Sequence, residues 1–309
     1  MTRNVWLQLI ALSLIWGMSF VLVGAVVHDT GAIQVAWARM AGGALFLLGF
    51  CLVVGQRLWP ETGSGAAFWA AAAAMGVLNN AVPFSLIAFG QLHISSDLAA
   101  ILNATTPFFA ALVAHLFAAD ERLTLHRLGG IAIGIAAVAV LVGPAALEAL
   151  GQGGLDGLLG QVMVLGAALS YAFAGVYGKR FRGRPPVQLA TAMLVMSTLT
   201  MTPLLLWAGP ASLIQDSAAG WAALAILGIA CSGLAYILYF RILAAAGATN
   251  VLLVTLLVPF SAAGLGALLL GNDLSLRAAL ALGLISLGLL VFDGRPAAAI
   301  RKRLRRAAA

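Results

Sequence analysis

The chain has 309 residues, of which 62% are hydrophobic and only 9% are charged, and its formal net charge is +7. A soluble domain has too little interior to hide so much apolar surface, so this composition excludes a soluble protein and indicates one that lipid surrounds. The positive charge lies in short segments between apolar stretches, which indicates a membrane-topology signal and argues against nucleic-acid binding.

The apolar stretches are long enough to cross a membrane, because roughly 20 apolar residues span about 30 Å of hydrocarbon as a helix. Backbone groups in lipid must find hydrogen bonds within their own segment, so we predict an all-α integral membrane protein. We predict ten transmembrane helices, at residues 5–27, 32–54, 67–89, 96–118, 126–143, 157–178, 187–207, 219–241, 248–270 and 275–293.

The second half of the chain repeats features of the first. Residues 76–91 and 228–243 each begin with Gly and carry an aromatic residue eight positions later. Residues 101–114 and 253–266 each centre on a Pro-Phe pair, and the same offset of 152 relates both pairs of segments. Internal repeats of this kind are common in secondary transporters.

Each copy holds about five predicted spans, and five is odd, so the second copy should cross the membrane in the opposite direction. We therefore predict two inverted five-helix repeats, with the first at residues 1–146 and the second at 154–295. Residues 296–309 form a basic tail after the second repeat. The halves are predicted to divide near the Gly-rich residues 151–157.

The distribution of Lys and Arg predicts the orientation of the chain. With the N-terminus in the cytoplasm, fifteen Lys and Arg residues fall on the cytoplasmic side and only Arg277 falls outside. This bias predicts cytoplasmic N- and C-termini in a bacterial-type inner membrane.

The sequence carries no recognisable catalytic motif: it has no Walker motif, no H-E-x-x-H and no G-x-S-x-G. Ser232 has no evident base, since the only His inside a predicted span, away from its first residue, is His115, so we predict that the protein is not an enzyme. Cys51 and Cys231 both lie within spans and are interpreted as small buried apolar residues, and neither a metal nor a cofactor is expected. The spans hold no carboxylate at mid-membrane, which favours a facilitative or exchange carrier over a proton-coupled pump.

Polar and aromatic side chains inside the spans share helical faces. In the third span Asn80, Phe84 and Gln91 follow the helical period, and in the eighth Ser232 and Tyr236 lie on the matching face. Lipid would leave amide and hydroxyl groups unsatisfied, so these faces should point inward, where they line a substrate path or simply hydrogen-bond to neighbouring helices. We predict a substrate path and assign to it Trp16, Phe20, Asn79, Asn80, Phe84, Gln91, Asn103, Tyr171, Tyr177, Ser232, Tyr236 and Tyr239.

Prolines mark three predicted breaks in the spans. Pro83 follows Asn79 by four residues and would free its carbonyl, so Asn79 and Asn80 are interpreted either as part of a site for polar substrates or as the cap of a kink. Pro107 and Pro259 occupy matching places in the fourth and ninth spans and should bend both helices. These three prolines are predicted to act in gating, with a purely structural kink as the alternative.

Arg39 is the only Arg well inside a predicted span. Three interpretations stay open at this point. The side chain extends to the membrane interface, pairs with Asp97, or faces a carboxylate of the substrate.

Several segments together give the chain a family resemblance. They are LSLIWGMSF (12–20), the Arg of AWARMAGG (36–43), the Asn-Ala-Thr-Thr-Pro-Phe run (103–108), ADERLT (119–124) and residues 247–275, where Asn-Asp replaces the family's common Gly-Glu. In their order and doubling they resemble the drug/metabolite transporter superfamily, in its EamA-type ten-helix branch, over nearly the whole chain.

This resemblance implies a central cavity lined by the first, third, fourth, sixth, eighth and ninth helices, and small metabolites, often amino acids, as substrates that are commonly moved outward. The aromatic set of Trp16, Phe84, Tyr171, Tyr236 and Tyr239 resembles that of aromatic amino acid exporters. The resulting hypothesis is a secondary transporter, monomeric or homodimeric among membrane lipids, that exports amino acids by alternating access. The alternatives are drugs or nucleotide-type metabolites as substrates, or a scaffold that binds lipids or a partner and transports nothing.

Overall fold

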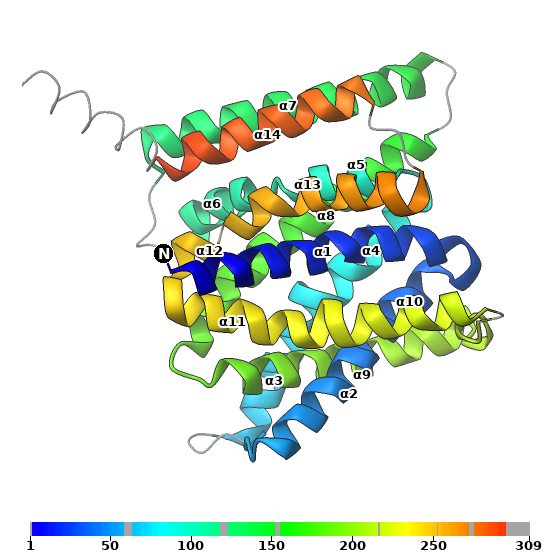
Figure 1. The fold of residues 1–309 in the computed structure, drawn as a ribbon, viewed down its shortest axis with the longest axis vertical. Coiled ribbons are helices and arrows are strands. Elements are labelled where there is room, and N and C mark those ends of the chain that lie inside the picture. The colour runs from blue at the N-terminus through cyan, green and yellow to red at the C-terminus, as the bar shows by residue number, and fades with distance from the viewer. Residues whose placement is uncertain are drawn as a thin grey trace, which may run out of the picture.

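The computed structural model describes residues 2–58, 64–117, 123–151, 155–215, 217–251, 253–271 and 275–294. It gives the backbone alone at residues 142–151, 212, 248 and 249. Every regular element in the described ranges is helical, which confirms the predicted all-α class (Figure 1).

The first half of the chain forms two long helices and two interrupted ones before α7. Its elements are α1 (Arg3–Thr30), α2 (Ala32–Val53), α3 (Gly65–Gly76), the π-helix η1 (Val77–Ala81), α4 (Val82–Gly90), α5 (Ser96–Asn103), α6 (Thr106–Phe117) and α7 (Leu125–Gly151).

The second half has the same order of elements. They are α8 (Asp156–Tyr177) with the short 3₁₀-helix η2 (Gly178–Phe181), α9 (Pro186–Ala208), the 3₁₀-helix η3 (Ala211–Leu213), α10 (Ala218–Gly228), the π-helix η4 (Ile229–Leu234), α11 (Ala235–Ala246), α12 (Ala248–Val251), α13 (Leu253–Leu270) and α14 (Leu276–Asp293).

The helices agree with the predicted spans. By length and composition, nine helical segments of the described chain are able to cross a membrane, and Leu125–Leu141 adds a shorter apolar helix. The largest difference is at the end of α7, which runs on to Gly151 where the predicted fifth span ends at 143. The Ala- and Leu-rich residues 145–150 favour a helix and carry it past Pro144. The division into repeats at 146 and 154 stays a prediction.

The two halves pack their helices in corresponding ways. In the first half α1 contacts α11 and α13, and in the second α8 contacts the counterparts α4 and α6. Likewise α2 contacts α10, and α9 contacts α3. Counterparts from the two halves also contact each other directly, among them α2 with α9 and α7 with α14. The pair of α7 and α14 lies at one edge of the molecule (Figure 1).

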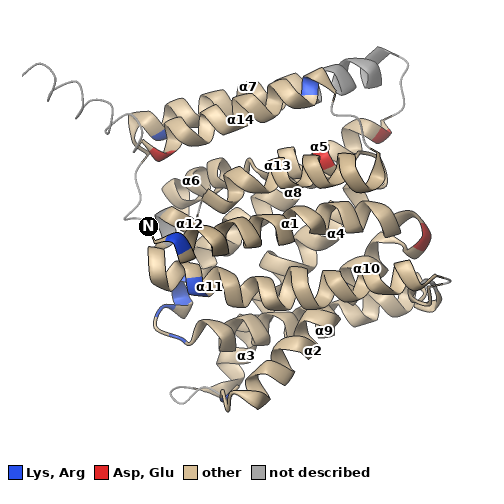
Figure 2. Cartoon of the chain, in the orientation of Figure 1, with Lys and Arg blue, Asp and Glu red and all other residues tan. Residues whose placement is uncertain are grey.

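Positively and negatively charged side chains gather at opposite ends of the helices. Most of the described Lys and Arg residues lie at the end of the molecule that carries the N-terminus, and most of the described Asp and Glu residues lie at the opposite end (Figure 2). The long helical walls between these ends are nearly free of charge in the picture, as a lipid environment requires (Figure 2).

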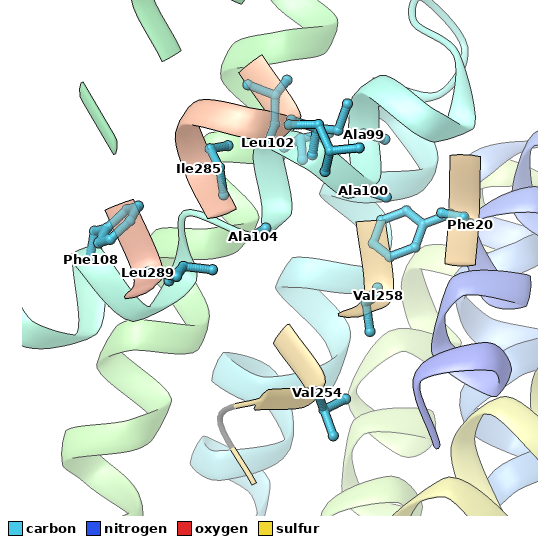
Figure 3. Packing of buried hydrophobic residues seen from close by; sticks show 14 of the residues in the cluster. Phe20, Ala99, Ala100, Leu102, Ala104, Phe108, Val254, Val258, Ile285 and Leu289 are labelled. Atoms are coloured by element: carbon cyan, nitrogen blue, oxygen red, sulfur yellow. The ribbon is translucent and has the colours of Figure 1, made fainter. Parts of the chain in front are cut away.

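The most extensive buried apolar cluster joins α1, α5, α6, α13 and α14. Figure 3 shows Phe20, Leu102, Val258 and Ile285 converging in it. Phe20 is only 5% exposed there. Lipid tails are as apolar as these side chains, so this cluster is stabilised by close packing more than by exclusion of water.

Glycines allow the closest helix crossings, and two of them open the repeated segments seen in the sequence. A Cβ atom on Gly228 would lie 2.7 Å from the Cα atom of Gly42, and one on Gly76 would lie 2.6 Å from the carbonyl oxygen of Met193. The repeated Gly therefore marks corresponding crossings, α10 on α2 and α3 on α9.

Gly228→Ala is expected to lower the free energy of unfolding by about 1–3 kcal/mol, because the added methyl group must push two backbones apart. Gly264→Ala on α13 is the matched control, since nothing lies within 4 Å of its added Cβ. Unfolding of the purified proteins in detergent measures both effects. Equal stability of Gly228→Ala and Gly264→Ala would contradict the close crossing.

Candidate functional site

Two π-helical turns interrupt the third and eighth spans at corresponding places. They are η1, which starts at Val77, and η4, which starts at Ile229. These two starting residues are separated by the same offset of 152 that relates the repeated segments of the sequence. In both, the N–H group that follows the turn donates to a carbonyl five residues earlier, from Val82 to Val77 and from Ala235 to Ala230. A π-helix is rare and is frequent at functional sites, because the wider turn re-aims side chains.

The first π-helix follows from Pro83. Proline has no N–H group to offer the Asn79 carbonyl, and its ring would collide with that carbonyl in a regular α-helix. The predicted break at Pro83 is therefore present, in the form of a widened turn that carries both Asn79 and Asn80.

The second π-helix arises without a proline. The hydroxyl of Ser232 donates to the carbonyl of Leu227 over 3.0 Å, five residues earlier, and Gly233 lies against the ring of Phe46 where no side chain would fit. Different residues thus produce the same wide turn in the two halves.

Tyr236 joins the two halves at this level of the structure. Asn79 Nδ2 donates to the Tyr236 hydroxyl over 2.9 Å, and that hydroxyl donates to Asn80 Oδ1 over 2.7 Å. Asn80 is fully buried. The predicted amide pair and a predicted aromatic residue of the matching face are therefore hydrogen-bonded to each other.

Arg39 of α2 lies beside this bridge. Its side chain is 7% exposed, its Nε atom donates to Ser232 Oγ over 3.1 Å, and its Cζ atom lies 4.0 Å from the centre of the Phe84 ring. Of the three interpretations, an extension to the membrane interface is wrong, because the side chain is buried. No ion pair links Arg39 to Asp97 in the described part of the chain, and the latter lies in the first turn of α5.

These side chains close into one ring of contacts. Arg39 contacts Ser232 and Phe84, and Tyr236 contacts Asn80. Ser232 lies four residues before Tyr236, and Asn80 lies four residues before Phe84, so each pair faces the same side of its span. We call this set the central ring: Arg39, Asn80, Phe84, Ser232 and Tyr236.

Arg39 was absent from the residues assigned to the substrate path. The available signal was that an ionisable residue inside a span is by default a functional candidate. Its partner was not evident from the sequence, because Ser232 lies 193 residues away.

Several predicted residues surround the central ring. The rings of Trp16 and Tyr239 lie 5.9 Å apart. Tyr171 and Tyr236 both pack against the buried cluster that contains Phe84. One turn from Asn80, the carbonyl of Leu78 accepts a hydrogen bond of 2.7 Å from Ser170 of α8.

Four predicted residues lie elsewhere. Phe20 packs in the apolar cluster of Figure 3. Tyr177 lies at the end of α8, where its ring meets that of Phe181 at a tilt and the guanidinium group of Arg180 covers its face. Gln91 and Asn103 are buried or half-buried, and their side-chain oxygens have no hydrogen-bond partner among the described residues, those of the central ring included.

The two repeat-matched prolines differ in their effect. The fourth span is broken at Ala104 and Thr105, just before Pro107, into α5 and α6. In the ninth span α13 continues through Pro259, and a bend at this proline stays a prediction. Neighbouring helices can satisfy the backbone groups that a proline frees inside a bundle, which allows the helix to continue.

A cavity of about 150 Å³ lies apart from the central ring, between α6, α7, α13 and α14. Pro107 and Thr255 line one side of it, with Arg127 and Phe292 on another. Within the described ranges, no cluster of three or more His, Cys, Asp and Glu side chains is placed to hold a metal ion.

An all-helical membrane protein whose buried polar side chains meet between two corresponding sets of helices has the architecture of a membrane transporter. The chain belongs to the EamA-like transporter family, whose sequence model matches residues 4–143 and again residues 158–292. This result confirms the resemblance to the drug/metabolite transporter superfamily.

Known proteins of similar sequence carry transporter names. The chain is 30% identical over 305 residues to the uncharacterized inner membrane transporter YedA of Escherichia coli strain K12, covering 94% of this chain and 93% of that protein. It is 22% identical to the uncharacterized transporter YoaV of Bacillus subtilis strain 168, over 93% and 95% of the two chains. A solved crystal structure with 17% identity matches 94% of this chain and 98% of its own with a TM-score of 0.66, which supports the fold.

Tyr236→Phe is expected to lower the free energy of unfolding by about 1–3 kcal/mol, because both Asn79 and Asn80 then lose a hydrogen-bond partner in a buried place. Tyr177→Phe is the matched control, since the hydroxyl of Tyr177 has no hydrogen bond to the described residues. Unfolding in detergent or in nanodiscs gives the comparison. A loss of stability that is no larger for Tyr236→Phe than for Tyr177→Phe would show that the bridge does not form.

Proposed function

We propose that this transporter exports small polar metabolites, with amino acids as the main class, by alternating access to a site at the central ring. The observation that carries this proposal is the hydrogen-bonded bridge of Tyr236 to Asn79 and Asn80, which links side chains of the two halves deep inside the helices.

A site assembled from both halves suits alternating access. Each hydrogen bond across the ring makes a net contribution of about 1 kcal/mol to stability. Separating the two halves at the ring therefore costs a few kcal/mol of free energy. A ligand shifts a two-state equilibrium when its affinities for the states differ by an amount in that range. Substrate bound at the ring is therefore able to decide which arrangement of the halves is favoured.

The matched π-helices support movement at this level. A widened turn has a weaker hydrogen-bond ladder than an α-helix, and hinges use such places to absorb changes of backbone angle. The corresponding packing of the halves and the odd number of predicted spans in each support the inverted repeat, and the separation of charge supports cytoplasmic termini (Figure 2).

The chemistry of the site favours a polar molecule with an aromatic or apolar part. Amide, hydroxyl and guanidinium groups in the ring supply the polar contacts, and Tyr171 packs in the same cluster as Phe84 and Tyr236. Phe240 contacts both Tyr236 and Tyr239, and the Tyr239 ring lies 5.9 Å from that of Trp16. The ring contains no carboxylate, so we favour a facilitative or exchange mode. A scaffold that transports nothing has no need of a polar ring that crosses both halves.

Liposomes with purified protein, loaded with unlabelled amino acids, should accumulate the same labelled amino acid by counterflow. Asn80→Leu and Trp16→Ala should reduce the rate at least tenfold while leaving folded protein in the membrane, and Trp221→Ala on the exposed face of α10 should leave the rate unchanged. Unchanged counterflow in both ring-region variants would show that these residues only pack the helices. A lack of flux for amino acids, drugs and nucleotides alike would support the scaffold instead.

A further inference from the structure

The guanidinium group of Arg39 carries a charge that its neighbours solvate but do not neutralise. Its contacts in the described part of the chain are the hydroxyl of Ser232 and the ring face of Phe84. A hydroxyl and an aromatic face are neutral, whereas a cation in a dry interior is most stable beside an anion. Guanidinium has five N–H donors in a planar fork, and the bond to Ser232 uses the Nε donor, which leaves the terminal amino groups for a ligand.

Asn80 supplies a second group that lacks a partner. Its Nδ2 atom is buried and has no hydrogen-bond acceptor among the described residues, although its Oδ1 atom accepts from Tyr236. The direction of the bridge explains this arrangement. Asn79 donates to the Tyr236 oxygen, so the single Tyr236 proton goes to Asn80 Oδ1 and the amide N–H of Asn80 is left over. Buried polar groups without partners are rare, and each calls for an explanation such as a ligand.

Both features belong to the central ring, and Phe84 connects them. Arg39 lies over Phe84, which is one helical turn beyond Asn80 on the same buried face. An un-neutralised cation from α2 and a free donor from η1 are thus linked through one aromatic side chain. Together they have the chemistry of a site for a planar anion, since a guanidinium fork matches the two oxygens of a carboxylate.

We propose that Arg39 and Asn80 bind the carboxylate group of the transported molecule. A carboxylate carries one negative charge and so balances the single cation of the ring, whereas a phosphate would leave surplus negative charge there. The ring offers no anion to an ammonium group, so recognition depends on the carboxylate and not on the amine. This assignment names the recognised group of the proposed function and rests on that function for transport, although not for binding.

Four probes of one shape test the assignment: phenylalanine, phenylalanine amide, 3-phenylpropionate and phenethylamine, with the other amino acids and their amides as a wider panel. In detergent, carboxylates should raise the melting temperature of the wild-type protein, and their amides and amines should require at least tenfold higher concentration for the same rise. If amides act as well as the corresponding carboxylates, or if no carboxylate of the panel acts, the assignment is overturned.

Asn80→Asp is the most discriminating variant. It keeps an oxygen for the Tyr236 hydroxyl, removes the free donor, and adds to the ring the anion that it lacks. We expect its melting temperature without ligand to equal or exceed that of the wild type, while the response to carboxylates falls at least tenfold. Arg39→Gln should lose the same response, and Arg127→Gln should keep it, since Arg127 faces the ring of Phe292 far from the site. A full carboxylate response in Asn80→Asp or Arg39→Gln would overturn the assignment.

Counterflow in liposomes separates this assignment from the proposed function. Equal transport of amino acids and their amides would contradict the carboxylate site but agree with the proposed transport of amino acids. Carboxylate-dependent binding without any flux would support the carboxylate site but contradict the proposed transport.

Discussion

The hydroxyl of Tyr236 accepts a hydrogen bond from Asn79 and donates one to Asn80, and this exchange occurs between helices that belong to different halves of the chain. In the interior of a membrane protein water is not at hand to replace a lost partner, so polar groups at this depth constrain which surfaces can meet. The arrangement of α2, α4 and α11 around the bridge satisfies that constraint. Ser232 lies one turn before Tyr236, and Phe84 lies one turn after Asn80. Arg39 contacts both Ser232 and Phe84.

The π-helices explain how two spans present these side chains together. A regular helix through Asn79 and Asn80 would require an N–H group where Pro83 has none, and the wider turn removes the conflict. The second half reaches the same backbone shape through Ser232 and Gly233. The close crossing at Gly42 and Gly228 then brings α2 against the second turn, which is why an Arg on α2 reaches Ser232.

Much of this fold was predictable from the sequence, because lipid imposes simple rules on length and polarity. The ten spans, the repeat offset and the inward faces of Asn80 and Tyr236 follow from hydropathy and from the helical period. The partner of Arg39 did not follow, since one sequence does not report which of several polar residues lies nearest in space. Phe20 lies in the buried apolar cluster. Because aromatic residues suit both cavities and packed cores, the sequence alone does not distinguish a packing role for Phe20 from a place in the substrate path.

The proline pair shows a different limit of sequence reasoning. Pro107 and Pro259 match in the repeat, yet only the first lies next to a break between helices. Whether a proline interrupts a helix depends on the neighbours available to its freed carbonyl, and these differ between the halves. The two copies share an arrangement of helices, but the side chains at matching positions differ. Asn79 in the first copy corresponds to Cys231 in the second, and Asn80 corresponds to Ser232.

A double-mutant cycle on Asn80→Ala and Tyr236→Phe tests most directly whether the two halves are joined at the central ring. Unfolding of the four proteins in the same detergent gives the coupling free energy between these side chains. A direct hydrogen bond in the interior predicts a coupling of about 0.5–2 kcal/mol. Effects that add to within about 0.3 kcal/mol would contradict the bridge, and with it the account of a site shared by both halves.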